Sequence, residues 1–238
     1  MSNILEIKGL KVVYGKSVAI HDVSLRVPEQ GIVTLVVSNG AGKSTTLNAA
    51  LGIVPTTEGE IRFCGEDITR LPTAERVRRG LVLAPEGRHL FPYLSVYKNL
   101  LLGATQRTDK QGIQEDLEYV YDLFPILKER AKQKAGTLSG GQQQMVAIAR
   151  GIMANPKLLC LDEPSLGLAP GVIEDIGQKI KELNRQKGIS ILLVEQNVHL
   201  AFDTASYCYT LQVGELVAEG TIEEIRQNDI VRKAYFGN

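Results

Sequence analysis

The segment from Gly31 to Thr45 constrains the fold of this chain more than any other part of it. Residues 31–37 read GIVTLVV, a continuous run rich in β-branched side chains, which predicts a strand buried on both faces. The next residues read SNGAGKST and lead into a helical pattern. Gly40 and Gly42 let backbone N–H groups turn toward phosphate oxygens, and the helix N-terminus adds a favourable dipole. A strand, a phosphate-binding loop and a helix in this order predict an α/β fold built on a parallel sheet.

The rest of the chain fits such a core with two additions. Further buried-strand runs occur at 158–161 and 189–194, and helical periodicity separates them. The first thirty residues alternate apolar and polar side chains, which predicts an N-terminal antiparallel β subdomain with one exposed face. Between about residues 90 and 150 the strand pattern disappears, and Gln114–Phe124 and Gly141–Met153 have helical spacing. We therefore expect a helical subdomain inserted between strands of the core.

The length of the chain bounds its organisation. With 238 residues it has the size of one domain, so we expect residues 1–238 to form a single domain that includes the helical insertion. The tail Thr221–Asn238 has apolar side chains spaced among charged ones, which predicts a packed terminal helix.

Charge and hydropathy exclude several classes of function. The chain has 27 basic and 27 acidic side chains, so nothing favours a nucleic acid as its partner. Its apolar runs are far shorter than the ~20 residues needed to cross a bilayer. The N-terminus lacks the regions of a signal peptide, and three scattered cysteines suit a reducing compartment. We expect a soluble, cytoplasmic protein with no transmembrane segment.

The glycine-rich loop carries the strongest chemical signal. Lys43 is placed to reach the β- and γ-phosphates of a nucleotide, and the Ser44 hydroxyl to bind Mg²⁺. Together with the buried strand, this predicts a P-loop NTPase core. The whole candidate nucleotide-binding segment comprises Ser38, Asn39, Gly40, Ala41, Gly42, Lys43, Ser44 and Thr45.

One position departs from the usual loop pattern, because Val37 stands where a glycine is expected. A β-branched residue tolerates positive φ poorly. Either the backbone stays in the β conformation at Val37 and nothing is lost, or nucleotide affinity suffers.

Two carboxylates follow another buried strand. Leu158–Leu161 leads directly to Asp162 and Glu163, at the sheet end where α/β proteins bind ligands. Asp162 is placed to hold Mg²⁺, and Glu163 to orient or deprotonate an attacking water. An acidic pair at a strand end is a weak signal alone, but the preceding phosphate loop strengthens it.

A third segment, Leu138–Ser139–Gly140–Gly141–Gln142, opens a helix. Ser139 is a suitable N-cap, and the two glycines let a phosphate approach the helix N-terminus. A plain capped helix after a glycine-rich loop would have the same pattern.

The three segments together resemble the nucleotide-binding subunits of ABC transporters, over essentially the whole chain. The resemblance implies ATP and Mg²⁺ as cofactors, and a head-to-tail dimer of ATP-binding subunits. In such a dimer Ser139, Gly140 and Gly141 would contact the γ-phosphate bound by the partner, with Gln142 completing that motif. Tyr14 matches the aromatic residue that stacks on adenine, and residues 165–168 match the loop between subunits.

Two family positions differ in this chain. The resemblance implies a nucleotide- and Mg²⁺-binding glutamine where Glu86 stands, and a catalytic histidine where Gln196 stands. Gln196 can still hydrogen bond near the γ-phosphate, but it cannot carry a positive charge. His199 lies nearby in sequence, and we expect it to be a surface residue.

These departures narrow the resemblance. The segments 85–92, 165–170 and 194–197 together look like the ATP-binding subunits of high-affinity branched-chain amino acid importers. That resemblance implies a sister ATPase, membrane permease subunits and a peripheral location on the cytoplasmic face of the inner membrane. Urea and amide importers share this organisation. In this arrangement Arg88 and Tyr93 are candidate permease contacts, whereas Cys160 belongs to the core.

Three other functions remain as alternatives. A soluble ABC ATPase of DNA repair or translation usually carries a coiled-coil insertion or two cassettes, and this chain has neither pattern. A regulatory subunit that binds nucleotide but hydrolyses it weakly is favoured by Val37 and Gln196, and opposed by Glu163. The lipopolysaccharide export ATPase is similar but would have glutamine at 86 and histidine at 196.

Overall fold

The computed structural model describes residues 2–37 and 42–228. Its centre is a six-stranded sheet with the strand order β10-β9-β3-β8-β7-β6. All its neighbouring strands are parallel except β9 and β10. The strands are β3 Ile32–Val37, β6 Leu81–Ala84, β7 Leu158–Asp162, β8 Ser190–Glu195, β9 Tyr207–Gln212 and β10 Glu215–Thr221. Every residue of β3, β7 and β8 is buried, which confirms the strands predicted from their continuous apolar runs.

A second sheet forms from the N-terminal part of the chain. It is antiparallel, with the order β2-β1-β4-β5. Its strands are β1 Asn3–Tyr14, β2 Ser17–Pro28, β4 Glu58–Phe63 and β5 Glu66–Asp67. In the register Ile7 pairs with Leu25, and both side chains pack into one core with Val33 of β3. The predicted antiparallel sheet with one exposed face is confirmed.

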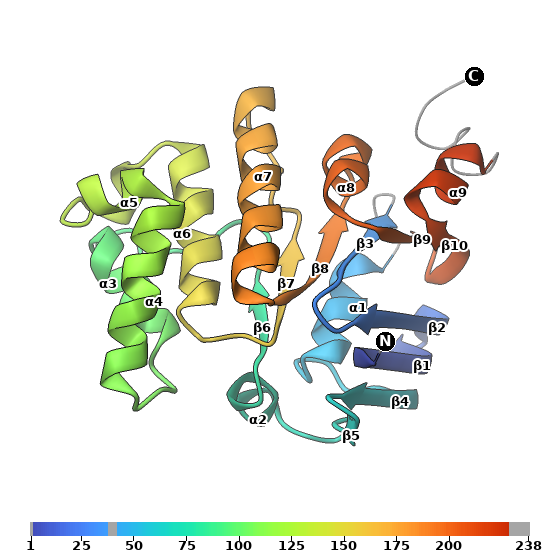
Figure 1. The fold of residues 1–238 in the computed structure, drawn as a ribbon. Coiled ribbons are helices and arrows are strands. Elements are labelled where there is room, and N and C mark those ends of the chain that lie inside the picture. The colour runs from blue at the N-terminus through green and yellow to red at the C-terminus, as the bar shows by residue number, and fades with distance from the viewer. Residues whose placement is uncertain (1, 38–41, 229–238) are drawn as a thin grey trace.

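Most helices lie on the other side of the central sheet. Figure 1 shows α3 to α6 grouped beside α7, away from the antiparallel sheet, and all of them fall between β6 and β7 or just after β7 in the chain. A second core cluster joins these helices to β7 and β8. The helices are α1 Lys43–Ala50, α2 Thr73–Arg78, α3 Val96–Gly103, α4 Lys110–Leu123, α5 Pro125–Glu129, α6 Gly140–Ile152, α7 Pro170–Lys187, α8 Val198–Thr204 and α9 Ile222–Gln227, with a 3₁₀ turn at Ala135–Thr137.

The helix boundaries differ from prediction by a few residues. The predicted helix Gln114–Phe124 begins earlier, at Lys110, and the terminal helix is described only as α9. Thr221 caps α9 through a capping box with Glu224, and residues 229–238 of the predicted helix lie outside the described residues. Cys160 is fully buried. Within the described ranges, no helix combines the length and apolarity needed to cross a membrane.

Candidate functional site

The candidate site lies at the carboxyl ends of the parallel strands β3, β7 and β8 (Figure 1). Val37 is the last residue of β3, fully buried and paired with Leu211 of β9. Its backbone therefore keeps the β conformation, and no positive φ is required of this β-branched residue. Ser38, Asn39, Gly40 and Ala41 fall outside the described residues.

Gly42 sets the angle at which α1 leaves the loop. Its φ of 97° lies in the left-handed region, which residues other than glycine rarely adopt. A Cβ atom here would lie 2.6 Å from Cδ1 of Ile20 and 3.0 Å from the carbonyl oxygen of Ala19. Glycine therefore allows α1 to approach β2 closely, and α1 begins at Lys43 with Ser44 and Thr45 in its first turn.

Lys43 is the centre of a charged cluster. Its ammonium forms an ion pair with Glu163 and a second one, of 3.3 Å, with Glu86. Gln196 donates a hydrogen bond from Nε2 to the same Glu163 oxygen. Burial alone would lower the pKa of Lys43, but the two carboxylates outweigh it and raise that pKa above its ordinary value. The structure thus brings four predicted site residues from different loops into contact.

Glu163 has an unusual backbone. Its φ is 46°, a left-handed conformation that costs a non-glycine residue about 1 kcal/mol. The N–H of Glu163 donates to the carbonyl oxygen of Val194 at 2.8 Å, and the residue is only 3% exposed. Such strain is typical of functional sites, where the surrounding structure holds a side chain in a required direction.

Asp162 is a buried carboxylate with one oxygen left unpartnered. Its Oδ1 atom accepts no hydrogen bond from the described residues. Burial, with the nearby Glu86 and Glu163 charges, raises the pKa of Asp162 to about 6, while Lys43 acts in the opposite direction. A divalent cation at this oxygen would satisfy it. The described ranges hold no group of three or more His, Cys, Asp or Glu side chains placed to bind a metal ion.

Glu195 is a site residue that the motif analysis missed. It is 1% exposed, and its carboxylate accepts hydrogen bonds from both the N–H and the hydroxyl of Ser165, at 2.9 and 2.8 Å. It also accepts from the N–H of Asn197 at 3.1 Å. Glu195 thereby ties the loop after Glu163 to the turn that carries Gln196. The signal available in the sequence was a carboxylate directly after the apolar run 189–194.

The segment Leu138–Gln142 begins α6. Ser139 is its N-cap and forms a capping box with Gln142, since each side chain bonds the other's backbone N–H. A Cβ atom on Gly141 would lie 2.7 Å from Cγ1 of Val172, so α6 and α7 approach closely here. Across residues 2–37 and 42–228, no hydrogen bond or ion pair joins this segment to Lys43 or Glu163.

Arg88, a candidate permease contact, also reaches α6 and the loop after Glu163 in its own chain. Its guanidinium lies 3.4 Å from Oε1 of Gln143 and 3.5 Å from the carbonyl oxygen of Leu166. Arg150 in turn donates to the carbonyl oxygens of Arg88 and His89. Residues 87–89 all have positive φ. Arg88 therefore links the loop of Glu86 to α6 and to residues 165–168.

The remaining predicted residues lie apart from this cluster. Tyr14 ends β1, and about half of its surface is exposed (48%). Tyr93 is 85% exposed, and Phe91 and Tyr97 near it are also exposed. His199 lies on α8 and lines a small cavity against α7 with Lys181.

The profile described as ABC transporter matches residues 20–166, more than half of the chain. This chain belongs to the ABC transporter family. Its members hydrolyse ATP, and the fold of this chain is the α/β P-loop NTPase fold of their ATP-binding cassettes.

Curated relatives of this ABC protein include two ATP-binding proteins of one organism. The chain is 46% identical to the high-affinity branched-chain amino acid transport ATP-binding protein BraG of Pseudomonas aeruginosa, covering 94% of this chain and 95% of BraG. It is 33% identical to BraF of the same organism, over 98% of each chain. The lipopolysaccharide export system ATP-binding protein LptB of Escherichia coli strain K12 is 37% identical, over 98% of this chain and 97% of LptB.

Solved cassettes agree with this membership. The ADP conformation of an ATP-binding cassette of an ABC transporter, MJ1267, aligns with a TM-score of 0.86 and 29% identity over 100% of both chains. A dimeric post-hydrolysis cassette bound to ADP and Pi, MJ0796, aligns with a TM-score of 0.79 and 25% identity, over 92% of this chain and 98% of that one.

Proposed function

We propose that this ABC protein is the ATP-binding and hydrolysing subunit of an importer for branched-chain amino acids. The observation that carries the proposal is the contact of Lys43, Glu163 and Gln196 at the sheet end, directly after a glycine-rich loop. The 46% identity to BraG supports the amino acid class of the cargo. A urea or amide importer is the alternative cargo class.

In the proposed reaction, ATP competes for Lys43. The phosphates replace Glu163 and Glu86 as partners of its ammonium, which frees the Glu163 carboxylate to accept a proton from, or orient, an attacking water. Gln196 then offers an amide hydrogen bond near the γ-phosphate without bringing a charge. Lys43 stabilises the negative charge that develops on the transferred phosphoryl group.

Asp162, Ser44 and Glu86 are the residues that would hold Mg²⁺. The unpartnered Oδ1 of Asp162 supports this assignment, since a buried carboxylate oxygen without a donor suits a cation. When bound, Mg²⁺ would neutralise phosphate charge. Glu86 in place of glutamine adds one negative charge to this ligand set.

We further propose that two ATP-binding subunits meet head to tail. Ser139, Gly140, Gly141 and Gln142 then reach the nucleotide of the partner, with Ser139 and Gln142 holding the N-terminus of α6 in its capped form. The exposed Tyr14 ring is available for adenine stacking, and Ser38–Thr45 would wrap the phosphates. The dimeric cassette neighbour supports this arrangement.

A permease docks in our proposal at the exposed side chains Phe91, Tyr93 and Tyr97. Aromatic residues of this size are enriched in protein interfaces and unfavourable in water. The surface follows Glu86 directly in the chain, so docking would act on the nucleotide site through the loop 85–89. The subunit would sit at the cytoplasmic face of the inner membrane, as one domain of residues 1–238 with a helical subdomain at about 90–150.

The test is ATP hydrolysis by the purified chain, alone and then with sister ATPase and permease subunits in proteoliposomes. We expect hydrolysis that rises in the full mixture and leucine uptake that depends on ATP. Uptake of urea or an amide in place of leucine would assign the alternative cargo. If the chain binds ATP but hydrolyses it in none of the mixtures, the alternative of a regulatory subunit is favoured, in line with Gln196 in place of histidine.

A further inference from the structure

Hydrogen bonds run in both directions between the loops at the carboxyl ends of β7 and β8. From the loop after β7, the N–H of Glu163 donates to the carbonyl oxygen of Val194 at 2.8 Å. Further along the same loop, the N–H and the hydroxyl of Ser165 donate to the carboxylate of Glu195, at 2.9 and 2.8 Å. In the opposite direction, Gln196 donates to the Glu163 carboxylate. β7 and β8 are neighbours in the sheet (Figure 1), so these bonds join the two loops on either side of Glu163.

Glu163 needs such restraints because its backbone is strained. A φ of 46° lies in the left-handed region, which a residue with a Cβ atom leaves unless the surrounding bonds hold it there. On the N-terminal side the restraint is the bond to Val194, and two residues further on it is the pair of bonds from Ser165 to Glu195. Without the second restraint the backbone can turn at Glu163, and its carboxylate would move away from Lys43.

Stability alone does not account for a carboxylate at position 195. Glu195 is buried, and burial raises the pKa of its carboxyl group, because the charged form is disfavoured away from water. Among the described residues, the donors that reach it are neutral groups of Ser165 and Asn197. An apolar side chain of the same volume would avoid the cost of burying a charge, but it could not accept these bonds. The carboxylate therefore serves to hold the two loops.

The same carboxylate also fixes the turn that carries Gln196. Its Oε2 atom accepts from the N–H of Asn197 at 3.1 Å, and the Asn197 side chain caps α8 by accepting from the N–H of Leu200 at 3.1 Å. Gln196 lies between these two anchored residues, so its side chain leaves a backbone that is held on both sides. Glu195 thus restrains the Glu163 carboxylate by two routes, through the loop after β7 and through the amide that donates to it.

We propose that Glu195 is a positioning residue for ATP hydrolysis, which holds the Glu163 carboxylate in place for the attacking water. Glu195 acts from behind the site, since both of its oxygens are engaged by the two loops. The inference rests on the proposed role of Glu163 as the base. Loss of the restraint should lower the turnover number, whereas ATP affinity, which depends on Lys43 and the glycine-rich loop, should stay close to that of the parent.

The test compares Glu195→Gln and Ser165→Ala in steady-state ATP hydrolysis and in ATP binding. Glutamine has nearly the same shape as glutamate, but its amide nitrogen accepts no hydrogen bond, so at least one anchor is lost. We expect the turnover number to fall by about 10²-fold, the scale of a reacting group displaced by ~1 Å, while the Kd for ATP changes less than about three-fold. Ser165→Ala keeps the backbone donor and should lower turnover by about ten-fold, the scale of one hydrogen bond. Turnover at the parent rate in both variants, or a loss confined to ATP affinity, would overturn the proposal.

A control variant separates positioning from a general loosening of β8. Thr34 of β3 is buried, and its hydroxyl donates to the carbonyl oxygen of Leu193 at 3.0 Å, within the sheet. Thr34→Val removes this bond and should lower the free energy of unfolding while leaving turnover unchanged. If Thr34→Val lowers turnover as much as Glu195→Gln does, weaker packing of β8 explains both results and the proposal is wrong.

A combined variant shows whether Glu195 acts through the base. In a Glu163→Gln background, Glu195→Gln should change the residual hydrolysis, measured with radiolabelled ATP, by less than about two-fold, because residues that act as a unit are not additive. An equal effect of Glu195→Gln in both backgrounds would contradict the proposal. Parent-rate turnover by Glu163→Gln alone would instead contradict the role of Glu163.

A readout without hydrolysis keeps the two proposals apart. In the nucleotide-free, isotopically labelled chain, the NMR signals of the Gln196 side-chain amide report its bond to Glu163. We expect these signals to move in Glu195→Gln toward the positions of a free glutamine amide. Unmoved signals would overturn the role of Glu195, whereas a parent chain that hydrolyses no ATP in any mixture would contradict the proposed function.

Discussion

Lys43 at the first position of α1 shares its ammonium between Glu163 and Glu86, whereas the last turn of α1 receives the guanidinium of Arg76. Arg76 is 2% exposed and donates to the carbonyl oxygens of Ala49 and Ala50 at 2.9 and 2.6 Å. It also donates to two carbonyl oxygens of the loop before α2, so all its partners are neutral.

The partners at the N-terminus of α1 can be exchanged for a ligand, whereas those at its C-terminus are part of the fold. The carboxylates on Lys43 occupy the place that phosphates take in the proposed reaction, so these ion pairs can be exchanged. The carbonyl oxygens at the other end of α1 have no competing ligand, and a cation there also favours the helix dipole. Changes at the first end should therefore alter catalysis, and changes at the second should alter stability.

The largest effect is expected for Glu163→Gln. Loss of the base that acts on water should lower ATP hydrolysis by about 10²–10⁴-fold. ATP binding should persist and become tighter, because Lys43 loses one counter-charge, and the variant should accumulate as an ATP-bound dimer. Phosphate release and size-exclusion chromatography with ATP measure the two outcomes. Turnover at the parent rate would show that Glu163 is not the base, and Glu129→Gln is the control.

Next in size is Arg76→Met, which removes the guanidinium donor from the carbonyl oxygens of Ala49 and Ala50, of which that of Ala49 keeps the N–H of Gly52. We expect a loss of about 3 kcal/mol in the free energy of unfolding, measured in urea. The turnover number of the folded fraction should stay close to that of the parent. Arg78→Met on the same helix removes an exposed ion pair with Glu75 and a long, exposed hydrogen bond to Gln106, so it should cost less than about 0.5 kcal/mol. Equal losses of stability in the two variants would show that the hydrogen bonds from Arg76 to the end of α1 contribute no more than one exposed ion pair.

Asp162→Asn should change how stability depends on pH. The raised pKa means that the folded chain holds this proton more tightly than the unfolded chain, whose ordinary value is about 3.9. The stability that Asp162 contributes is present below that value and is lost as the pH rises through about 6.

Without Mg²⁺, the free energy of unfolding of the variant should then exceed that of the parent by on the order of 2 kcal/mol at pH 7.5. Near pH 4 the two values should be equal. Urea unfolding in EDTA at both pH values measures this. An identical pH slope in parent and variant would show that Asp162 is already ionised at low pH in the folded chain.

The smallest effect is expected for Glu86→Gln. This change removes the 3.3 Å ion pair from Lys43 but leaves Glu163 in place. Titration calorimetry in EDTA should show ATP binding about three-fold tighter, as expected for one partly exposed pair. Glu66→Gln, far along the chain, serves as the control. Weaker binding would mean that Glu86 supports the lysine rather than competing for it.

Sequence alone predicted the fold well because its strongest patterns are local. The apolar runs of β3, β7 and β8 are continuous, and each is followed by polar residues, so the sheet end that carries Lys43, Asp162 and Gln196 could be located. The contacts of these residues with one another could not be derived, since the ion pair of Lys43 with Glu86 joins loops far apart in the chain.

Arg76 and Glu195 show why the rest was missed. In sequence Arg76 stands among other charged residues of a short helix, where an exposed side chain is the usual outcome. Glu195 follows a buried apolar run, and its sequence position is equally compatible with an exposed carboxylate at the end of the strand. In both cases burial depends on hydrogen-bond acceptors or donors supplied by distant segments, at Ala49 and Ala50 or at Ser165. Residue spacing does not encode such partners.

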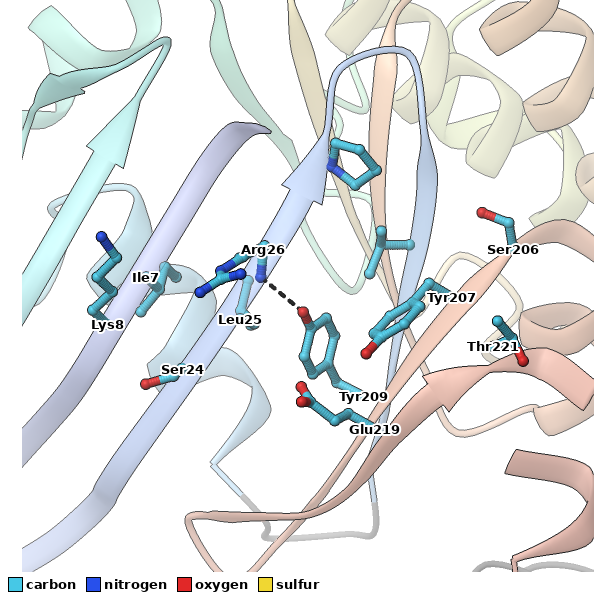
Figure 2. A pocket seen from close by; sticks show the side chains of 12 residues that line it. Ile7, Lys8, Ser24, Leu25, Arg26, Ser206, Tyr207, Tyr209, Glu219 and Thr221 are labelled. Carbon is cyan, nitrogen blue, oxygen red and sulfur yellow. Dashed lines mark hydrogen bonds between the residues drawn. The ribbon is translucent and has the colours of Figure 1, made fainter. Parts of the chain in front are cut away.

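The bond from the N–H of His21 to the carbonyl oxygen of Gly214, 3.0 Å long, bears on how the subunit behaves before it is assembled. β2 is an outer strand of the antiparallel sheet, and β10 is an outer strand of the central sheet. This bond and the one from the N–H of Arg26 to the Tyr209 hydroxyl (Figure 2) join β2 to the hairpin of β9 and β10. The opposite outer strands, β5 and β6, are only two and four residues long. Long unpaired strand edges recruit other chains into aggregates, and short or covered ones do not. These edges therefore disfavour strand-to-strand association between free chains.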